Sequence, residues 1–169
     1  ALANSEHRVE AAQRFLEAKE RRQVGSEGWA RATAAAFNKL IQEECAEAAK
    51  PEWWNDEGLK VMSARAVRAA PDTTSANRMR ALVLCGMTDA WEAGPRSVAE
   101  FKEAATHFDR AAALHTAPAM KAQLAGFAVF MRGQPERQAQ LDANKAQLLV
   151  LETFLQESRA RSAAELTEA

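Results

Sequence analysis

The chain has 169 residues, of which 47% are hydrophobic and 27% charged, and its formal net charge is −1 at pH 7. This length fits a single domain, which can bury enough surface to fold without a metal or a disulfide. The near-neutral charge, with no basic cluster, argues against nucleic-acid binding. The chain has seven glycines, five prolines and no tyrosine, and it is rich in strong helix formers, so we expect no strand-rich fold and predict an all-α protein.

Helix starts and stops divide the chain into about seven expected helices. In chain order they occupy about 4–24, 26–49, 55–69, 72–91, 97–116, 118–131 and 135–156. Each carries apolar residues at the three- and four-residue spacing that places them on one face. Gly ends a helix in the left-handed conformation, and the residue before Pro leaves the helical region. The expected breaks fall at Gly25, Pro51, Pro71, Gly94, Pro118 and Gly133. Breaks this short make neighbouring helices antiparallel.

Several helix starts have a capping signal. Ser26 is expected to cap the second helix, Asn55 or Asp56 the third, and Asp72 or Thr73 the fourth. Ser97 and Glu100 have the spacing of a capping box, in which each side chain bonds the backbone N–H of the other.

The last expected helix begins near Pro135 and runs past Gln156. Its apolar positions approximate the a/d seam of a coiled coil, although Asn144 and Lys145 interrupt it. The seam consists of Leu141, Leu148, Leu151 and Leu155. We interpret it as a cap on the last helix pair, and the alternatives are a partner-binding helix or a homodimer seam. The expected domains are therefore a helical-hairpin domain at 1–133 and this helix at 134–169, with a frayed tail after Arg161.

The middle of the chain contains two similar segments. Each is a small-residue helix that ends at an Ala-Pro step, and Pro71 and Pro118 lie 47 residues apart. Gly86 and Gly126, which follow Leu-Cys and Leu-Ala, lie 40 residues apart. A period of about 40 to 47 residues is typical of helix-pair repeats.

This part of the chain resembles the tetratricopeptide family. Ala104, Phe108 and Ala111 match the family's series of small, aromatic and small residues, and Pro118 falls two residues later than its helix-ending proline. Gly86 fits the glycine of the family's first helix, whereas the family's Trp and Tyr are missing there. The resemblance covers roughly residues 58–132 and implies antiparallel hairpins stacked as a short right-handed α-solenoid. Residues 91–108 also look like tetratricopeptide-like proteins of unicellular algae.

The resemblance implies a non-catalytic scaffold, or an accessory or linker subunit of a larger assembly, that holds a protein partner in a concave groove. The family's peptide-clamping residues do not map onto this sequence. No apolar run is long enough to span a bilayer and no signal peptide is visible, so we expect an intracellular protein. Its location is cytoplasmic or organellar, and the algal likeness favours the chloroplast among organelles. A partner in a membrane complex remains compatible with this expectation.

Two adjacent indoles are the candidate contact residues outside the last helix. Trp53 and Trp54 lie in the break after Pro51, and we expect one of them to be exposed as a binding residue. The alternative is that both fold over the edge of the core. Trp29 and Trp91 occupy apolar stripe positions and are expected in the core. The candidate partner-binding residues are thus Trp53, Trp54, Leu141, Leu148, Leu151 and Leu155.

The residues that carry chemistry form no catalytic or metal-binding pattern. Cys45 and Cys85 lack the spacing of a zinc site and are expected as buried free thiols, with a disulfide as the alternative. Glu103 and His107 are four residues apart, so we expect an exposed Glu–His pair. We therefore predict no enzyme activity, cofactor or metal. The alternative function is a small helical enzyme or ligand carrier, with a pocket between helices lined by His107 or Cys85.

Overall fold

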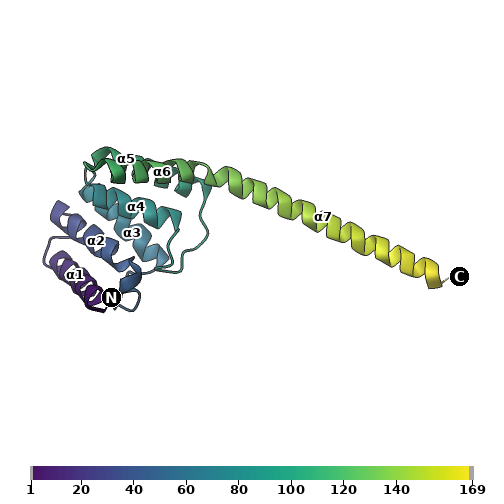
Figure 1. Ribbon diagram of the computed structural model, residues 1–169, viewed down its shortest axis with the longest axis horizontal. Coiled ribbons are helices and arrows are strands. Elements are labelled where there is room, and N and C mark those ends of the chain that lie inside the picture. Colours follow the sequence, from purple (N-terminus) through teal and green to yellow (C-terminus); the bar gives the residue numbers. More distant parts are fainter. Residues whose placement is uncertain (1, 168–169) are drawn as a thin grey trace. The chain divides into compact units, whose positions relative to one another are not determined.

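The computed structural model describes the backbone of residues 2–167 and the side chains of residues 6–156 and 159. Helices make up nearly all its regular structure (Figure 1), and the described residues contain no strand, which confirms the all-α prediction. The α-helices are α1 (Leu2–Glu20), α2 (Glu27–Leu40), α3 (Asp56–Ala69), α4 (Thr74–Cys85), α5 (Val98–Leu114), α6 (Pro118–Arg132) and α7 (Gln134–Thr167). A short 3-10 helix, η1 (Glu43–Cys45), follows α2.

The chain divides into two compact units, Ala1–Arg132 and Gly133–Ala169. In the first unit each helix from α1 to α6 packs on the next in sequence, and α2 also packs on α4. Figure 1 shows this order, with α1 and α5 at opposite ends of the unit. The second unit is α7. Within the described residues, no helix combines the length and the apolar character needed to cross a membrane.

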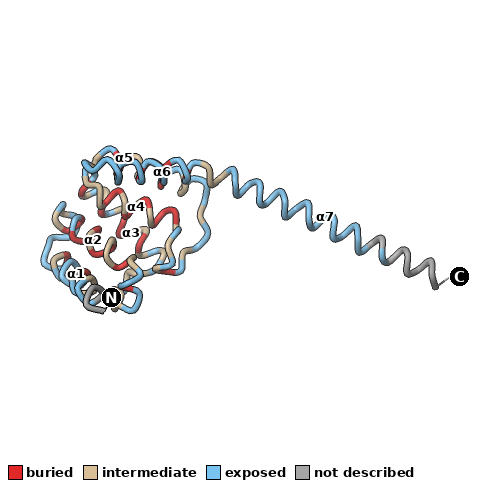
Figure 2. Tube along the Cα trace, viewed as in Figure 1, coloured by how far each residue is buried: buried red, intermediate tan, exposed pale blue. Residues whose placement is uncertain are grey.

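The core of the first unit consists of two clusters of buried side chains. One gathers residues of α2, α3 and α4 around Trp29, Phe37 and Trp91, and the other gathers residues of α4, α5 and α6 around Phe108 and Leu124. Trp29 and Trp91 are both buried, as expected. Buried alanines lie throughout these contacts and let the helix axes approach closely. Figure 2 shows the buried positions along α2, α3 and α4.

The expected caps are largely present. The side chains of Ser26 and Asn55 accept hydrogen bonds from the backbone N–H groups of Trp29 and Gly58. Both hydrogen bonds of the predicted capping box at Ser97 and Glu100 are made. Thr73 stands at the N-cap of α4, but its hydroxyl donates to the carbonyl of Ala70 instead of accepting from the helix.

Three helices end earlier than the sequence predicts, and the first of them, α1, ends at Glu20 rather than near Val24. α2 ends at Leu40 rather than near Ala49, and the chain then turns through η1. α4 ends at Cys85 rather than near Trp91, because Gly86 adopts a left-handed conformation with φ of +61° and closes the helix. Glycine lacks a Cβ, so it adopts this left-handed conformation without a steric cost and can end the helix.

Two other sequence expectations also fail. Gly126 lies inside α6, whereas Gly86 lies after the end of α4, so their 40-residue spacing does not relate equivalent positions. The positive-φ glycines of the described chain are Gly25 and Gly86, so Gly133 does not take the left-handed cap conformation predicted for it. α7 is helical to Thr167, residues 168–169 lie outside the described backbone, and fraying of the tail after Arg161 stays a prediction.

Candidate functional site

Trp53 and Trp54 both lie half-buried at the edge of the core, as in the second of the two sequence interpretations. The indole N–H of Trp54 donates to the carbonyl of Ala90 at 2.8 Å, and its ring packs against Phe37 at a centroid distance of 5.6 Å. The ammonium of Lys19 lies 5.8 Å from the Trp53 ring centroid. Both indoles therefore already contact side chains of their own chain.

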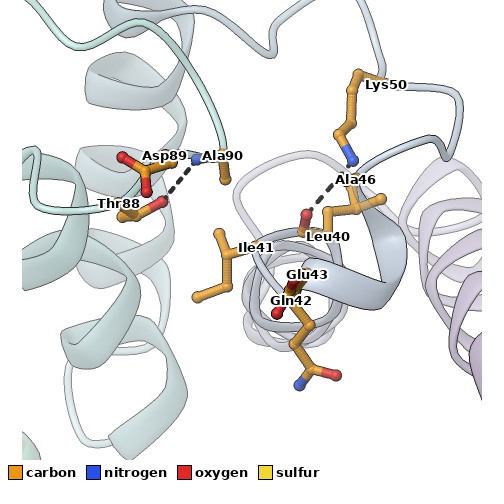
Figure 3. A pocket seen from close by; sticks show the side chains of 9 residues that line it. All are labelled: Leu40, Ile41, Gln42, Glu43, Ala46, Lys50, Thr88, Asp89 and Ala90. Atoms are coloured by element: carbon orange, nitrogen blue, oxygen red, sulfur yellow. Dashed lines mark hydrogen bonds between the residues drawn. The ribbon is translucent and has the colours of Figure 1, made fainter.

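A hollow of about 520 Å³ opens beside Trp54, between the end of α2 and the loop that follows α4. Figure 3 shows its lining, which comes from Leu40 to Ala46, from Lys50 and from the segment Thr88–Ala90. Its charged groups are those of Glu43, Lys50 and Asp89.

The ammonium of Lys50 acts on the end of α2. It donates to the carbonyl of Leu40 at 3.4 Å and to that of Cys45 at 2.5 Å, and it lies 5.6 Å from the Trp54 ring centroid. Burial lowers the pKa of Lys50, against the opposing effects of Cys45 and Glu47. Because a cation bonded to the last carbonyls stabilises a helix C-terminus, Lys50 has a structural role here.

A buried ion-pair network links the start of α3 to the loop between α4 and α5. Arg96, whose side chain is 4% exposed, forms a bidentate pair with the carboxylate of Asp56. The same guanidinium donates to the carbonyls of Val83 and Gly94 at 3.0 and 3.1 Å. The indole N–H of Trp91 adds a hydrogen bond to Asp56 at 3.2 Å.

Lys60 and Glu100 extend this network to the start of α5. The Lys60 ammonium lies 2.9 Å from the Glu100 carboxylate and 3.4 Å from that of Asp56. Hydrogen bonds from Arg96 hold the pKa of Asp56 well below its ordinary range, although burial opposes the shift. Burial alone would raise the pKa of Glu100, but hydrogen bonds from Ser97 and Lys60 lower it to about 2. Each of these four charged groups has an oppositely charged partner, so removing one of them would leave another charge unpaired.

An apolar groove of about 540 Å³ runs along one face of α6 and is open to solvent. It is lined by Leu82, Cys85, Met87, Phe108, Gln123, Gly126, Phe127, Phe130 and Met131. Phe127 and Met120 have the spacing of the apolar stripe of this helix, but their side chains are 40% and 39% exposed. That stripe is therefore only half covered, because Leu124, Ala128 and Met131 are buried and these two are not.

The four leucines of the predicted seam are all exposed. Their side chains lie on α7, where every residue from Glu136 to Gln156 is exposed. The same segment exposes Leu149, Val150 and Phe154. So many exposed apolar side chains on one helical segment are unusual outside an interaction surface.

His107 was expected in an exposed pair with Glu103, but its side chain is mostly buried and contacts Asn77. Its side chain is 17% exposed, and its Nδ1 lies 2.9 Å from the amide oxygen of the buried Asn77. Asn77 donates its amide to the carbonyls of Pro71 and Thr73, so its oxygen accepts and His107 Nδ1 carries the proton. Glu103 lies 3.7 Å from the other ring nitrogen but bonds Arg80 at 2.7 Å. Burial lowers the pKa of His107, against the opposing effect of Glu103.

Both cysteines are free and buried, as expected, and the alternative disulfide is not formed. The thiol of Cys85 lies 3.3 Å from the carbonyl of Leu82, and burial raises its pKa, which keeps it protonated and unreactive. His107 is not among the groove-lining residues, so the structure does not bring it and Cys85 together in that groove. The residues that the structure describes include no group of three acidic, His or Cys side chains that could hold a metal.

Sequence reasoning missed the ion-pair network and the groove. Asp56 and Arg96 are 40 residues apart, and only the acidic residue in the first turn of a helix gave a local signal. The sequence of α6 could not predict the groove, because the apolar residues of a helix have the same spacing whether or not another helix covers them. Comparisons of this chain with family models, with curated proteins and with solved structures gave no match.

Proposed function

We propose that this protein is a helical scaffold, or an accessory subunit of a larger assembly, whose function is to bind another protein rather than to catalyse a reaction. The observation that carries this proposal is the solvent-open apolar groove along α6. Large exposed apolar surface is costly for a protein that acts alone, and it commonly marks a protein-binding site.

The architecture of the first unit supports a repeat-type scaffold. Helices α1 to α6 pack in sequence order, and α2 also contacts α4, which is how stacked helix pairs bury a continuous core. Ala104 and Ala111, the small residues of the tetratricopeptide-like series, are fully buried, and Phe108 is 1% exposed. We propose on this basis that the unit is a short solenoid of the tetratricopeptide type.

The groove has the form that fits an amphipathic helix. Its lining on α6 falls at residues 123, 126, 127, 130 and 131, which are the i, i+3, i+4, i+7 and i+8 positions of one helical face. A row of this length spans about 12 Å along the helix axis. Gly126 lies within it, and a Cβ built there meets no atom within 4 Å, so a partner helix can approach the backbone closely.

The side chains along the groove suit a row of apolar side chains on the partner. Phe127 and Phe130 offer aromatic contacts, and Met87 and Met131 add flexible thioethers that adapt to the shape of a ligand. We therefore propose that the partner inserts the apolar face of a helix, with its polar face left in water. The partner would be a subunit of a cytoplasmic or organellar assembly.

The test compares two variants of the full chain in affinity purification from the source organism. Phe127→Glu with Phe130→Glu places two carboxylates in the groove, whereas Val129→Glu places one carboxylate at a residue of α6 that does not line it and is 67% exposed. We expect a partner to be retained by the wild type and by Val129→Glu and to be lost with the groove variant. Equal retention by both variants, or no stoichiometric partner of the wild type, would contradict the proposal.

A further inference from the structure

The apolar side chains of α7 have no covering surface in the described chain. Leu148, Leu151 and Leu155 are 59%, 57% and 53% exposed, although leucine side chains are strongly driven out of water. Most helices in proteins are held by packing an apolar face rather than by helix propensity. A 34-residue helix with so much exposed leucine therefore calls for a partner surface.

The exposed leucines form one narrow stripe. Residues 141, 144, 148, 151 and 155 alternate three- and four-residue steps, which is the a/d pattern of a two-stranded coiled coil. Leu149 and Val150 lie outside this stripe, on either side of the opposite face. The residues that flank the stripe at the e positions are Gln138, Lys145, Glu152 and Arg159.

These flanking charges are complementary in an antiparallel pair of identical helices. A twofold axis between residues 148 and 151 places Leu148 against Leu151 of the second copy, and Leu151 against Leu148. The same axis brings Lys145 of each copy to Glu152 of the other, because e positions face e positions in the antiparallel arrangement. Two equivalent ion pairs then flank the central leucines.

The parallel arrangement lacks this complementarity. There Lys145 faces Gln140 of the second copy and Glu152 faces Gln147, so neither charge finds an opposite partner. The parallel register also sets Arg137, at the next d position, against Arg137 of the second copy. The antiparallel register instead sets Asn144 of each copy against Leu155 of the other, at the end of the leucine layers.

We propose that two copies of this chain associate through an antiparallel pair of α7 helices, with Leu148 against Leu151 at the centre and Lys145 of each copy facing Glu152 of the other. The residues of this surface on α7 are not among those that line the groove on α6. The dimer would present two copies of the first unit to partners, which raises the effective affinity for any assembly that offers two sites.

The experiment is sedimentation equilibrium of the full chain, compared with α7 variants. Leu148→Glu with Leu151→Glu should give a monomer, because four carboxylates would meet at the centre of the pair. The control, Leu149→Glu with Val150→Glu, makes the same number of changes at similarly exposed positions off the stripe and should remain a dimer. Circular dichroism of each variant establishes that its helices are intact.

Charge reversal tests the orientation. Lys145→Glu or Glu152→Lys alone sets like charges together at both ends of the pair and should weaken dimerisation roughly tenfold. The combined variant restores both ion pairs and should return the dissociation constant to the wild-type value. At high salt these differences should shrink, because the pairs are exposed.

Several outcomes would overturn the proposal. A wild-type chain that stays monomeric up to about 100 µM would do so, since a useful dimer forms below that concentration. So would a mass above two copies, or a dimer that survives Leu148→Glu with Leu151→Glu. A dimer lost with Phe127→Glu and Phe130→Glu would assign the contact to the groove on α6 instead. Single charge reversals without effect would overturn the antiparallel register.

Discussion

The guanidinium of Arg96 joins three segments that lie far apart in the chain. It bonds Asp56 at the start of α3, Val83 near the end of α4 and Gly94 in its own loop. A buried charge needs a counter-charge, which Asp56 supplies, although the Nε of Arg96 is buried without a hydrogen-bond partner among the described residues. Arg96 thus fixes the path of a loop that has no regular secondary structure between α4 and α5.

Asp56→Asn should strongly destabilise the first unit. The substitution leaves the guanidinium of Arg96 buried without its counter-charge, so we expect a loss of about 3–5 kcal/mol in the free energy of unfolding. Asp72→Asn is the matched control, because Asp72 pairs with Arg110 at 2.8 Å but both side chains are at least half exposed. That change should cost less than about 1 kcal/mol. Urea denaturation followed by circular dichroism measures both, and equal losses would assign Asp56 no special role.

Acid should destabilise the protein in a defined pH range. The folded-state pKa values of Asp56 and Glu100 both lie below their ordinary values of 3.8 and 4.5. Between about pH 4.5 and 2, these two groups therefore bind fewer protons in the folded state than in the unfolded state. Their contribution to the free energy of unfolding is fully present above about pH 4.5 and is lost as the pH falls towards 2. Because the pKa of Glu100 is about 2 in the folded state, its share of this stability is lost as the pH falls from about 4.5 towards 2.

Urea denaturation at pH 7, 5, 4 and 3 checks this profile. Glu100→Gln should flatten the decline between pH 5 and 3, because the group that takes up the proton is removed. A variant with the same slope as the wild type would mean that other carboxyl groups cause the acid sensitivity.

At the scale of the helix, the positions of the glycines separate helix ends from helix interiors. Gly86 ends α4 with φ of +61°, and a Cβ built there would lie 2.9 Å from Arg96 Nε and 3.0 Å from the Cβ of Ala93. Gly126 lies inside α6 and its Cβ would meet nothing within 4 Å. The two glycines therefore have different physical roles, although both follow similar dipeptides in the sequence.

Alanine substitutions at these glycines should have opposite effects. Gly86→Ala should lower stability by about 1–2 kcal/mol or more, because a left-handed conformation disfavours any side chain and this one also meets close neighbours. Gly126→Ala should raise stability by about 0.5–1 kcal/mol, because alanine is the better helix former. Thermal unfolding measures both shifts. A fall in melting temperature for both variants would show that Gly126 is also constrained by contacts.

The stripe of α6 illustrates why periodicity does not decide burial. Met120, Leu124, Phe127, Ala128 and Met131 share one side of the helix in the sequence, yet only Leu124, Ala128 and Met131 are buried. A helix at the edge of a stack has the same amphipathic pattern as one in the middle. What lies against the outer half depends on neighbours that the local sequence does not specify.

At the scale of the whole molecule, the first unit should fold without α7. Both clusters of buried side chains lie within residues 29–131. A chain truncated after Arg132 should therefore unfold cooperatively in urea, with a free energy of unfolding within about 0.5 kcal/mol of the value for this unit in the full chain. Loss of the cooperative transition would show that α7 contributes to the core. The comparison is made at low protein concentration, where association does not contribute.

Local signals in the sequence determined the helical class, most of the helix starts and the core tryptophans Trp29 and Trp91. Capping and helix propensity act over a few residues, so Ser26, Asn55 and the Ser97–Glu100 box could be identified without neighbours. The ends of α2 and α4 could not be identified from the sequence. They depend on Lys50 and on the loop that Arg96 holds, and these residues reach their hydrogen-bond partners only in the folded chain.

Only the tertiary structure decided which apolar residues remain in water. The half-buried Trp53 and Trp54, the open face of α6 and the exposed leucines of α7 all have sequence patterns that are equally compatible with a core position. Burial is set by contacts between segments distant in the chain, and Asp56 and Arg96 show the same dependence for charges. The sequence therefore determined which faces are apolar, and the packing of the helices decided which of them remain exposed.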